Sequence, residues 1–305
     1  MKRLVALIVG LLSCGATAQG GEFALEQVAP GNYVHFGRHE DRSPLNLGDN
    51  ANIGFIVGER CVLVIDSGGS LPVGRALRAA IGEVTPLPVC YVVITHVHPD
   101  HFFGAAAFRE DKPQFIGHAE LPRALAARGK FYKSTLERDL GESAQGSEII
   151  VPELLVEDRL RLDLGGRFIE VRAWPVAHTD NDLTVFDEAT STLWLADLLF
   201  LQHTPVVDGS ILGFLRVLDA LAQLPAQHIV PGHGRSDADW PQVLAAQRRY
   251  LELIVRQTRQ ALKDGVTIQD AVDAVGTEEA PNWVNFDTYH KRNVTGAYTE
   301  LEWED

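Results

Sequence analysis

The segment 95–101, Thr-His-Val-His-Pro-Asp-His, constrains this chain more than any other part of its sequence. It places three imidazoles and one carboxylate (His96, His98, Asp100 and His101) within six residues. Imidazole and carboxylate are good ligands for a borderline-soft divalent cation such as zinc. Histidines that merely end a strand would seldom carry this spacing. The segment therefore predicts a metal site.

The residues before this segment predict how its side chains point. Residues 89–94, Val-Cys-Tyr-Val-Val-Ile, have the β-branched, apolar pattern of a buried strand. Residues two apart in an extended chain point to the same side, so His96 and His98 can reach one metal ion. Pro99 favours an extended conformation at His98. Asp100 and His101 follow in the turn, where they can face a second ion.

The net charge of the chain limits the kinds of molecule that it can bind. The 305-residue chain is 46% hydrophobic and 22% charged, which is ordinary for a soluble globular protein. Its formal net charge of -14 argues against nucleic acid and anionic membrane surfaces as partners. We therefore expect a small-molecule substrate. The sequence leaves the oligomeric state open.

The first residues read as an export signal. Lys2 and Arg3 precede a short apolar run over residues 4–12, and Ala16-Thr17-Ala18 provides small residues for cleavage. This pattern predicts a signal peptide over residues 1–18 and a periplasmic or secreted protein. The apolar run is too short to span a bilayer. As an alternative, Leu11-Leu12-Ser13-Cys14 weakly resembles a lipobox, which would lipidate Cys14.

Two cysteines remain after such a cleavage. Cys61 and Cys90 each begin a strand-like run, 61–66 and 90–95. If these strands are parallel neighbours, the sulfurs lie close together, and an exported protein could form the bridge. Neighbouring parallel strands give a disulfide unfavourable geometry, however. We therefore expect two buried free thiols.

Hydrophobic periodicity predicts alternating strands and helices. The expected strands are residues 23–28, 33–36, 52–57, 61–65, 89–95, 115–117, 154–156, 161–164, 168–173, 183–186, 192–196 and 228–230. The expected helices are residues 71–81, from the metal motif to about 108, 119–128, 212–223, 241–263 and 268–275. This order suits two mixed sheets packed face to face with helices outside. We expect one domain over residues 19–240 and a helical C-terminal extension over 241–305, packed on it.

Three more potential ligands lie where predicted strands end. His178 follows the strand that ends near 173, Asp197 closes the strand 192–196, and His233 follows the strand at 228–230. Side chains on loops at strand ends commonly form the active sites of layered folds. These three residues therefore join the four of the leading segment as candidate metal ligands.

In this order the ligands resemble the metallo-β-lactamase superfamily, over roughly residues 23–240. The resemblance implies a four-layer αββα sandwich with a site for two zinc ions at its edge. It implies that His96, His98 and His178 bind one ion, that Asp100, His101 and His233 bind the other, and that Asp197 bridges them. Asp66 also matches a position that supports the metal loop.

The resemblance also implies a chemistry. Each ligand set leaves a coordination position for water, as catalytic zinc sites do. Two ions would share one hydroxide, lower its pKa toward neutrality and let it attack a carbonyl carbon. Asp100 would orient this nucleophile and is the expected catalytic residue. Asp66 is expected to support one of the metal-bound imidazoles.

The bridging residue indicates the branch of the superfamily. The true β-lactamases carry Cys or Ser there, whereas Asp197 is similar to the hydrolases of the glyoxalase II type. A thioester or another activated ester is therefore the expected substrate. Residues 177–182, 203–209 and 290–294 are similar to exported zinc hydrolases that accompany periplasmic sulfur-oxidation or quinoprotein dehydrogenase systems. That likeness adds a thiol adduct on a carrier as a possible substrate.

Three other functions remain open from the sequence. The chain could hydrolyse β-lactams. It could be an iron-dependent oxidoreductase like the persulfide dioxygenases, which needs one iron held by two histidines and one carboxylate. It could also be a non-catalytic zinc-binding accessory protein. We further expect the loop around His203 to border the substrate, and Trp174 to be a packing residue.

Overall fold

The structure is a computed structural model that describes residues 23–235 and 238–304. The predicted export signal, residues 1–18, and Cys14 lie outside these ranges. Within the described ranges no helix has the length and apolar character that crossing a membrane requires.

The first sheet has seven strands in sequence order. Strands β1 to β4 pair antiparallel, and β4 to β7 pair parallel. The strands are β1 (Glu26–Ala29), β2 (Asn32–His35), β3 (Ile53–Val57), β4 (Val62–Ile65), β5 (Val89–Ile94), β6 (Gln114–His118) and β7 (Leu154–Val156).

The second sheet has five strands in the order β12-β11-β10-β9-β8. Only the pair β11 and β12 is parallel. The strands are β8 (Arg159–Asp163), β9 (Phe168–Ala173), β10 (Leu183–Asp187), β11 (Thr192–Phe200) and β12 (His228–His233).

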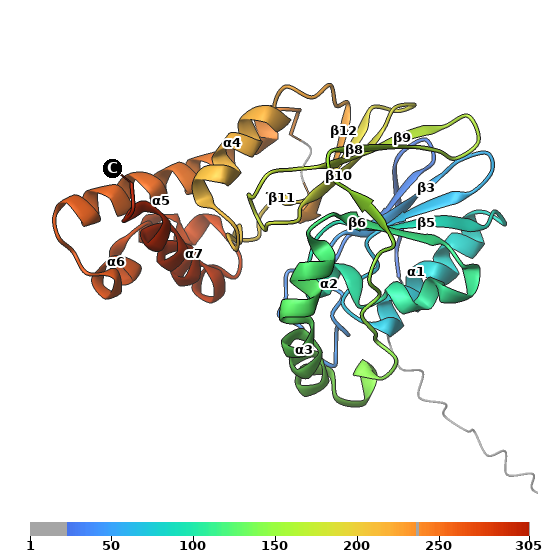
Figure 1. The fold of residues 1–305 in the computed structure, drawn as a ribbon, viewed down its shortest axis with the longest axis horizontal. Coiled ribbons are helices and arrows are strands. Elements are labelled where there is room, and N and C mark those ends of the chain that lie inside the picture. Colours follow the sequence, from blue (N-terminus) through green and yellow to red (C-terminus); the bar gives the residue numbers. More distant parts are fainter. Residues whose placement is uncertain (1–22, 236–237, 305) are drawn as a thin grey trace, which may run out of the picture.

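Helices flank both sheets on their outer sides, and those of the second sheet lie beside β11 and β12 (Figure 1). The α-helices are α1 (Leu71–Val84), α2 (Pro99–Phe102), α3 (Leu121–Leu140), α4 (Ile211–Leu221), α5 (Ala245–Lys263), α6 (Ile268–Ala274) and α7 (Phe286–Leu301). Short 3-10 helices span Ala105–Asp111, Gly141–Ala144, Gln242–Leu244 and Thr277–Asn282. Helices α1 to α3 belong to the side of the first sheet, and α4 to α7 to the side of the second.

The alternation of side chains along the strands produces the layers. In β4 all four residues are buried, but Leu63 packs between the two sheets whereas Val62 and Val64 pack against α1. In β11 Trp194 packs between the sheets, and Leu193 faces the cluster that includes α4, α5 and α7. Successive residues of a strand point to opposite faces, so a fully apolar strand joins two cores. The predicted αββα sandwich is confirmed.

The prediction of one continuous helix from the metal motif to about residue 108 was wrong. Helix α2 ends after one turn, and a separate 3-10 helix follows from Ala105. The N–H of Gly104 donates to the carbonyl of Gly68 at 2.9 Å rather than continuing the helix. A Cβ at Gly104 would collide with the carbonyl of Ser67, so only glycine allows this approach.

Helix α3 is longer than the predicted 119–128 and extends to Leu140. Phe131 is exposed and lines a pocket instead of packing in the core, so it does not follow the periodicity of a buried face. Helix α7 was not predicted. Its buried face includes His290 and Asn293, and polar residues at those positions hide a helix from a hydrophobicity pattern.

The C-terminal helices pack on the second sheet through one hydrophobic cluster. Phe214 of α4, Tyr250 of α5 and Val294 of α7 are fully buried there together with Leu195 of β11. The predicted helix over 241–263 consists of the 3-10 helix Gln242–Leu244 followed by α5. The division of the chain at residue 240 remains our proposal for its organisation.

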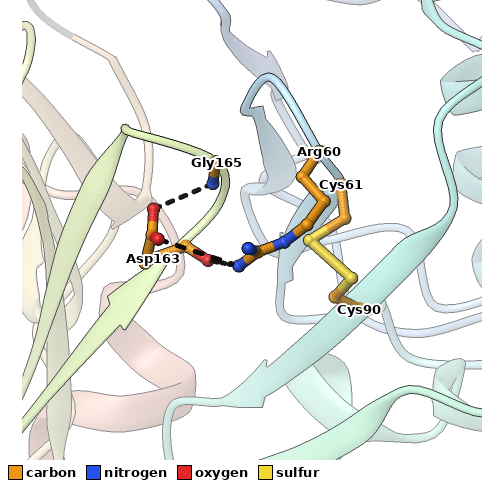
Figure 2. Close-up of a disulfide and its surroundings, with 5 residues drawn as sticks. All are labelled: Arg60, Cys61, Cys90, Asp163 and Gly165. Atoms are coloured by element: carbon orange, nitrogen blue, oxygen red, sulfur yellow. Dashed lines mark hydrogen bonds and ion pairs between the residues drawn. A yellow bond between two sulfur atoms is a disulfide. The ribbon is translucent and has the colours of Figure 1, made fainter.

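Cys61 and Cys90 form a disulfide in the structure, so the expectation of free thiols was wrong (Figure 2). Strands β4 and β5 are parallel neighbours, but their register shifts between Val62 and Leu63. Cys90 is the extra residue at this irregularity, and Cys61 lies just before β4. The two Cα atoms are therefore 5.8 Å apart, within the range that a disulfide spans.

Arg60 connects this end of the first sheet to the second sheet. Its guanidinium donates to the carbonyl of Asp163 at the end of β8, and the Asp163 carboxylate accepts from the N–H of Gly165 at 2.9 Å (Figure 2). The disulfide thus lies beside a contact between the two layers.

We expect the disulfide to contribute about 3 to 4 kcal/mol to the free energy of unfolding, since it closes a loop of 29 residues. Chemical denaturation of the wild type should shift to a lower midpoint when a reductant is added. The double variant Cys61→Ser/Cys90→Ser should unfold at the lower midpoint with or without the reductant. Equal wild-type midpoints under both conditions would show that the thiols are free in the purified protein.

Candidate metal centre

All seven predicted ligands meet at one edge of the sandwich. His96 and His98 follow β5, Asp100 and His101 lie in α2, and the others come from the second sheet or its loops. His178 lies in the β9–β10 loop, Asp197 in β11 and His233 at the end of β12. Their ligand atoms form two groups, each with all atoms within 4.8 Å of one another: His96, His98, His178 and Asp197 in one, and Asp100, His101 and His233 in the other.

Asp197 lies between the two groups. Its Oδ2 atom is 3.5 Å from His96 Nε2 and 3.3 Å from His178 Nε2. Its Oδ1 atom is 3.1 Å from His101 Nε2 and 3.5 Å from His233 Nε2. One carboxylate oxygen therefore faces each group, which is the arrangement of a bridging ligand.

The backbone around Asp197 is specialised for this position. Ala196 has a φ of 46°, in the left-handed region that residues with a side chain seldom adopt. Gly232 of β12 lies so close that a Cβ there would collide with Asp197 Oδ1. A glycine at 232 and a left-handed residue at 196 therefore allow the carboxylate to enter the centre.

Every imidazole of the centre donates its other N–H to an acceptor outside it. The bonds are His96 Nδ1 to Thr95 Oγ1 (3.0 Å), His98 Nε2 to Asp208 Oδ2 (2.8 Å), His101 Nδ1 to Asp66 Oδ2 (2.7 Å), His178 Nδ1 to the Val206 carbonyl (2.7 Å) and His233 Nδ1 to the Asn50 carbonyl (2.8 Å). The acceptors fix the tautomers, so that five lone pairs converge on the centre. Outer partners of this kind orient metal-binding histidines.

The facing atoms fit divalent cations. His96 Nε2, His101 Nε2 and Asp197 Oδ1 are buried and have no hydrogen-bond partner among the described residues. His98 Nδ1 and His178 Nε2 lie 2.9 Å apart. The second ring nitrogen of each histidine donates to another acceptor, so the two facing nitrogens both carry lone pairs. Buried polar atoms without partners and opposed lone pairs are unfavourable. Cations bound between them would remove both costs.

The pKa shifts of two imidazoles also indicate a cation site. Burial lowers the pKa of His178 to about 4, so the imidazole stays neutral, the form that binds a metal. Burial lowers the pKa of His101 too, but the carboxylates of Asp197, Asp66 and Asp100 outweigh it and raise the pKa well above its usual range. Excess negative charge around this imidazole favours a cation.

Asp66 lies where the sequence predicted a supporting residue. Its Oδ2 accepts from His101 Nδ1 and from Thr95 Oγ1 at 2.8 Å, and its Oδ1 accepts from the Thr95 N–H at 2.9 Å. Its φ of 56° again lies in the left-handed region. Asp66 thereby connects His101 to Thr95, which in turn holds His96.

A pocket of about 790 Å³ opens over the centre. Asp100, Asp197 and His233 form part of its floor, and the expected loop after β11 contributes His203, whose ring stacks on that of His233. Trp174 lies elsewhere and donates to Thr184 Oγ1 at 2.9 Å, as a packing residue would. The open faces of the centre therefore meet a cavity that a small molecule can enter.

Sequence reasoning missed several residues of this pocket. Asp208 holds His98, and only its place in the loop after Asp197 could have indicated it. Arg128 and Tyr132 of α3 and Tyr289 and Arg292 of α7 line the wall. The bounds of helix α7 were not predicted, but the likeness of residues 290–294 to exported zinc hydrolases indicated the segment that carries Arg292.

Comparisons with known proteins are consistent with this geometry. The family model of the metallo-beta-lactamase superfamily matches residues 47–233, more than half of the chain. No curated protein sequence gives a significant match. Solved structures with the same fold include the stereoselective inverting sec-alkylsulfatase Pisa1 from Pseudomonas sp., with a TM-score of 0.70 and 18% identity. That match covers 92% of this chain, which spans half the length of the alkylsulfatase.

Metallo-beta-lactamases match over a shorter range. The enzyme from Pontibacter korlensis has a TM-score of 0.60 and 15% identity, over 75% of this chain and 98% of its own. FIM-1 from Pseudomonas aeruginosa, in a mono-zinc form, has a TM-score of 0.57 and 16% identity, over 75% and 94%. At such identities these structures share the fold. The family match and the fold together show that this chain belongs to the metallo-beta-lactamase superfamily of metal-dependent hydrolases.

Proposed function

We propose that the protein is an exported hydrolase that holds two zinc ions and cleaves a small thioester or another activated ester. The observation that carries this proposal is the position of Asp197, with one oxygen toward each group of imidazoles. A single-metal centre would need only one of these groups. We assign His96, His98 and His178 to one ion, Asp100, His101 and His233 to the other, and Asp197 to both.

Two bound zinc ions would supply Lewis-acid chemistry, lowering the pKa of water and polarising a carbonyl. The chain's own residues provide orientation. Asp100 lines the pocket, with its Oδ2 3.4 Å from His233 Nε2 and 3.7 Å from His101 Nε2. Its carboxylate can thus hold the attacking water in line with a bound substrate and accept a proton. Phe131 and Val206 contribute apolar side chains to the lining of the same pocket.

Export rests on two observations of different kinds. The pattern of residues 1–18 predicts a signal peptide, and the Cys61–Cys90 disulfide suits an oxidising compartment. The thioester preference rests on the aspartate at the bridging position. The intact set of seven ligands disfavours an iron-dependent oxidoreductase, which needs three, and a purely structural zinc protein, which needs no open pocket.

A second candidate is the hydrolysis of a sulfate ester. The alkylsulfatase matches 92% of this chain, whereas the metallo-beta-lactamases match 75% to 77%. Because the fold of the alkylsulfatase matches more of this chain, a sulfate ester is a candidate substrate besides an acyl compound. The two reactions differ in the bond that is cleaved, so a substrate panel distinguishes them.

Metal analysis tests the proposal first. Protein purified without chelator should contain two zinc ions per chain by elemental analysis. A tight chelator should remove them together with the activity, and added zinc should restore it. One iron per chain would contradict the hydrolase proposal and would support oxidation of a sulfur substrate.

A substrate panel tests the reaction. Wild-type protein should hydrolyse thioesters faster than sulfate esters or the β-lactam nitrocefin. Asp100→Ala should lower kcat about 100-fold or more, since it removes both a ligand and the group that orients water. Asp219→Ala, an exposed residue of α4, should leave kcat unchanged. Faster sulfate-ester cleavage would favour the second candidate, and equal turnover of nitrocefin and thioesters would contradict the substrate preference.

A further inference from the structure

The pocket wall carries positive charge on a strongly acidic chain. Outside the seven ligands, the lining includes four arginines but only three aspartates, whereas the whole chain has a formal net charge of -14. The arginines share carboxylates in pairs. Arg42 and Arg138 both pair with Asp139, and Arg128 and Arg292 both pair with Asp208.

The second pair lies beside the metal centre. Asp208 Oδ2 accepts from His98 Nε2 at 2.8 Å and lies 3.3 Å from Arg128 Nη1, while Oδ1 accepts from Arg292. The single negative charge of Asp208 thus faces the positive charges of two guanidiniums, one from α3 and one from α7. Neither arginine has another ion-pair partner among the described residues.

The two guanidiniums also keep donors available. Each guanidinium has five N–H donors in a planar fork, and Asp208 has two oxygens, one of which His98 already uses. Arg128 additionally contacts the Tyr132 hydroxyl at 3.5 Å. The side chain of Asp208 is 4% exposed, whereas those of Arg128 and Arg292 are 40% and 56% exposed. The carboxylate is therefore buried beneath the two cations, which remain open to the pocket.

We propose that Arg128 and Arg292 form a binding site for an anionic group of the substrate, such as a carboxylate, sulfonate or sulfate. The inference rests on the proposed function, because it places the reactive bond over the metal centre and the anion on the arginine pair. Asp208 fixes both arginines relative to His98, so the distance from the anion to the reactive bond selects the substrate. A positive wall also attracts anions to a protein that would otherwise repel them.

Kinetics with a matched pair of thioesters tests the site. The two substrates share a thiophenol leaving group, and one acyl part is acetyl while the other is succinyl with a free carboxylate. Wild-type kcat/KM should be higher for the succinyl compound. Arg128→Ala and Arg292→Ala should each lower it about 10- to 100-fold for the succinyl compound only. Arg161→Ala changes an exposed arginine that pairs with Glu188 and does not line the pocket, so it should affect neither substrate.

Binding of a simple anion separates this inference from the proposed reaction. Propane-1-sulfonate should bind the zinc-loaded wild type in a calorimetric titration, and both alanine variants should weaken it about tenfold or more. If the protein hydrolyses no ester but this pattern holds, the anion site stands and the proposed reaction fails. Unchanged sulfonate binding in both variants would contradict the site. Arg292→Lys, which keeps the charge, provides a second variant if Arg292→Ala unfolds.

A different observation concerns the neighbouring residue of α7. Asn293 is fully buried, its Oδ1 accepts from the Val207 N–H at 3.0 Å, and its Nδ2 donates to the Pro205 carbonyl at 2.6 Å. It thus holds the backbone on both sides of Val206. The carbonyl of Val206 accepts from Nδ1 of the ligand His178 at 2.7 Å.

A second buried layer braces Asn293. Its Nδ2 also donates to the Tyr250 hydroxyl at 2.9 Å, and that hydroxyl lies 3.0 Å from His290 Nδ1. His290 Nε2 donates to the Val275 carbonyl at 2.7 Å. A continuous set of hydrogen bonds therefore runs from the C-terminal helices to a metal ligand.

We infer that Asn293 is a positioning residue that sets the orientation of His178 through the carbonyl of Val206. Loss of an outer partner of a metal-binding histidine typically weakens metal binding 10- to 100-fold. A role in packing alone would lower stability without changing the ligand field of the metal.

Cobalt binding tests this role without any substrate. Asn293→Ala should weaken binding of the Co²⁺ ion that His178 holds about 10- to 100-fold, measured by chelator competition, and should change the visible absorption bands. Val294→Ala removes a fully buried neighbour on the same helix, so it should lower the melting temperature but keep the wild-type affinity and spectrum. Tyr250→Phe, which removes only the brace, should give a smaller change in the spectrum. Wild-type affinity and spectrum in Asn293→Ala would contradict the inference.

Discussion

The buried carboxylate of Asp197 is the group on which the rest of the site depends. It lies among four imidazoles, two from the first sheet and two from the second, and its Oδ1 has no hydrogen-bond partner among the described residues. A buried charge of this kind is costly unless opposite charge compensates it. Metal ions between the two sheets would provide that charge. Metal binding and the packing of the sandwich are thus coupled, since neither sheet alone supplies a complete centre.

The fold prepares this centre with backbone features that are unfavourable in isolation. Asp66 and Ala196 adopt left-handed conformations, and Gly232 leaves space that a side chain would fill. Strained residues persist where the surrounding structure determines them and commonly cluster at functional sites. Here each of the three lies next to a ligand or its support. The apolar strands β4 and β11, each packed on both faces, provide the rigidity that keeps these residues in place.

The sequence predicted the parts of the molecule whose chemistry or periodicity is local. Six residues carried the motif from His96 to His101, and strand ends located His178 and His233. The predicted end of the strand at 196 was wrong, since β11 continues to Phe200 and Asp197 lies within it. The residues of the pocket wall could not be predicted from hydrophobic periodicity. Phe131 faces the cavity, and His290 and Asn293 occupy core positions of α7, so neither helix shows the expected apolar stripe there. The disulfide depended on a register shift between β4 and β5, which strand patterns do not reveal.

Helix α7 contacts both the support of the metal centre and the wall of the pocket, through two adjacent residues. Asn293 points inward to the loop that supports His178, and Arg292 reaches Asp208 at the pocket wall. If both residues act as we propose, the buried face of the helix supports a metal ligand, and its exposed side contacts the substrate. Function in such folds depends on the residues placed around a common scaffold. In this chain the C-terminal helices contribute to that scaffold, and α7 contributes to the lining of the pocket over the metal centre.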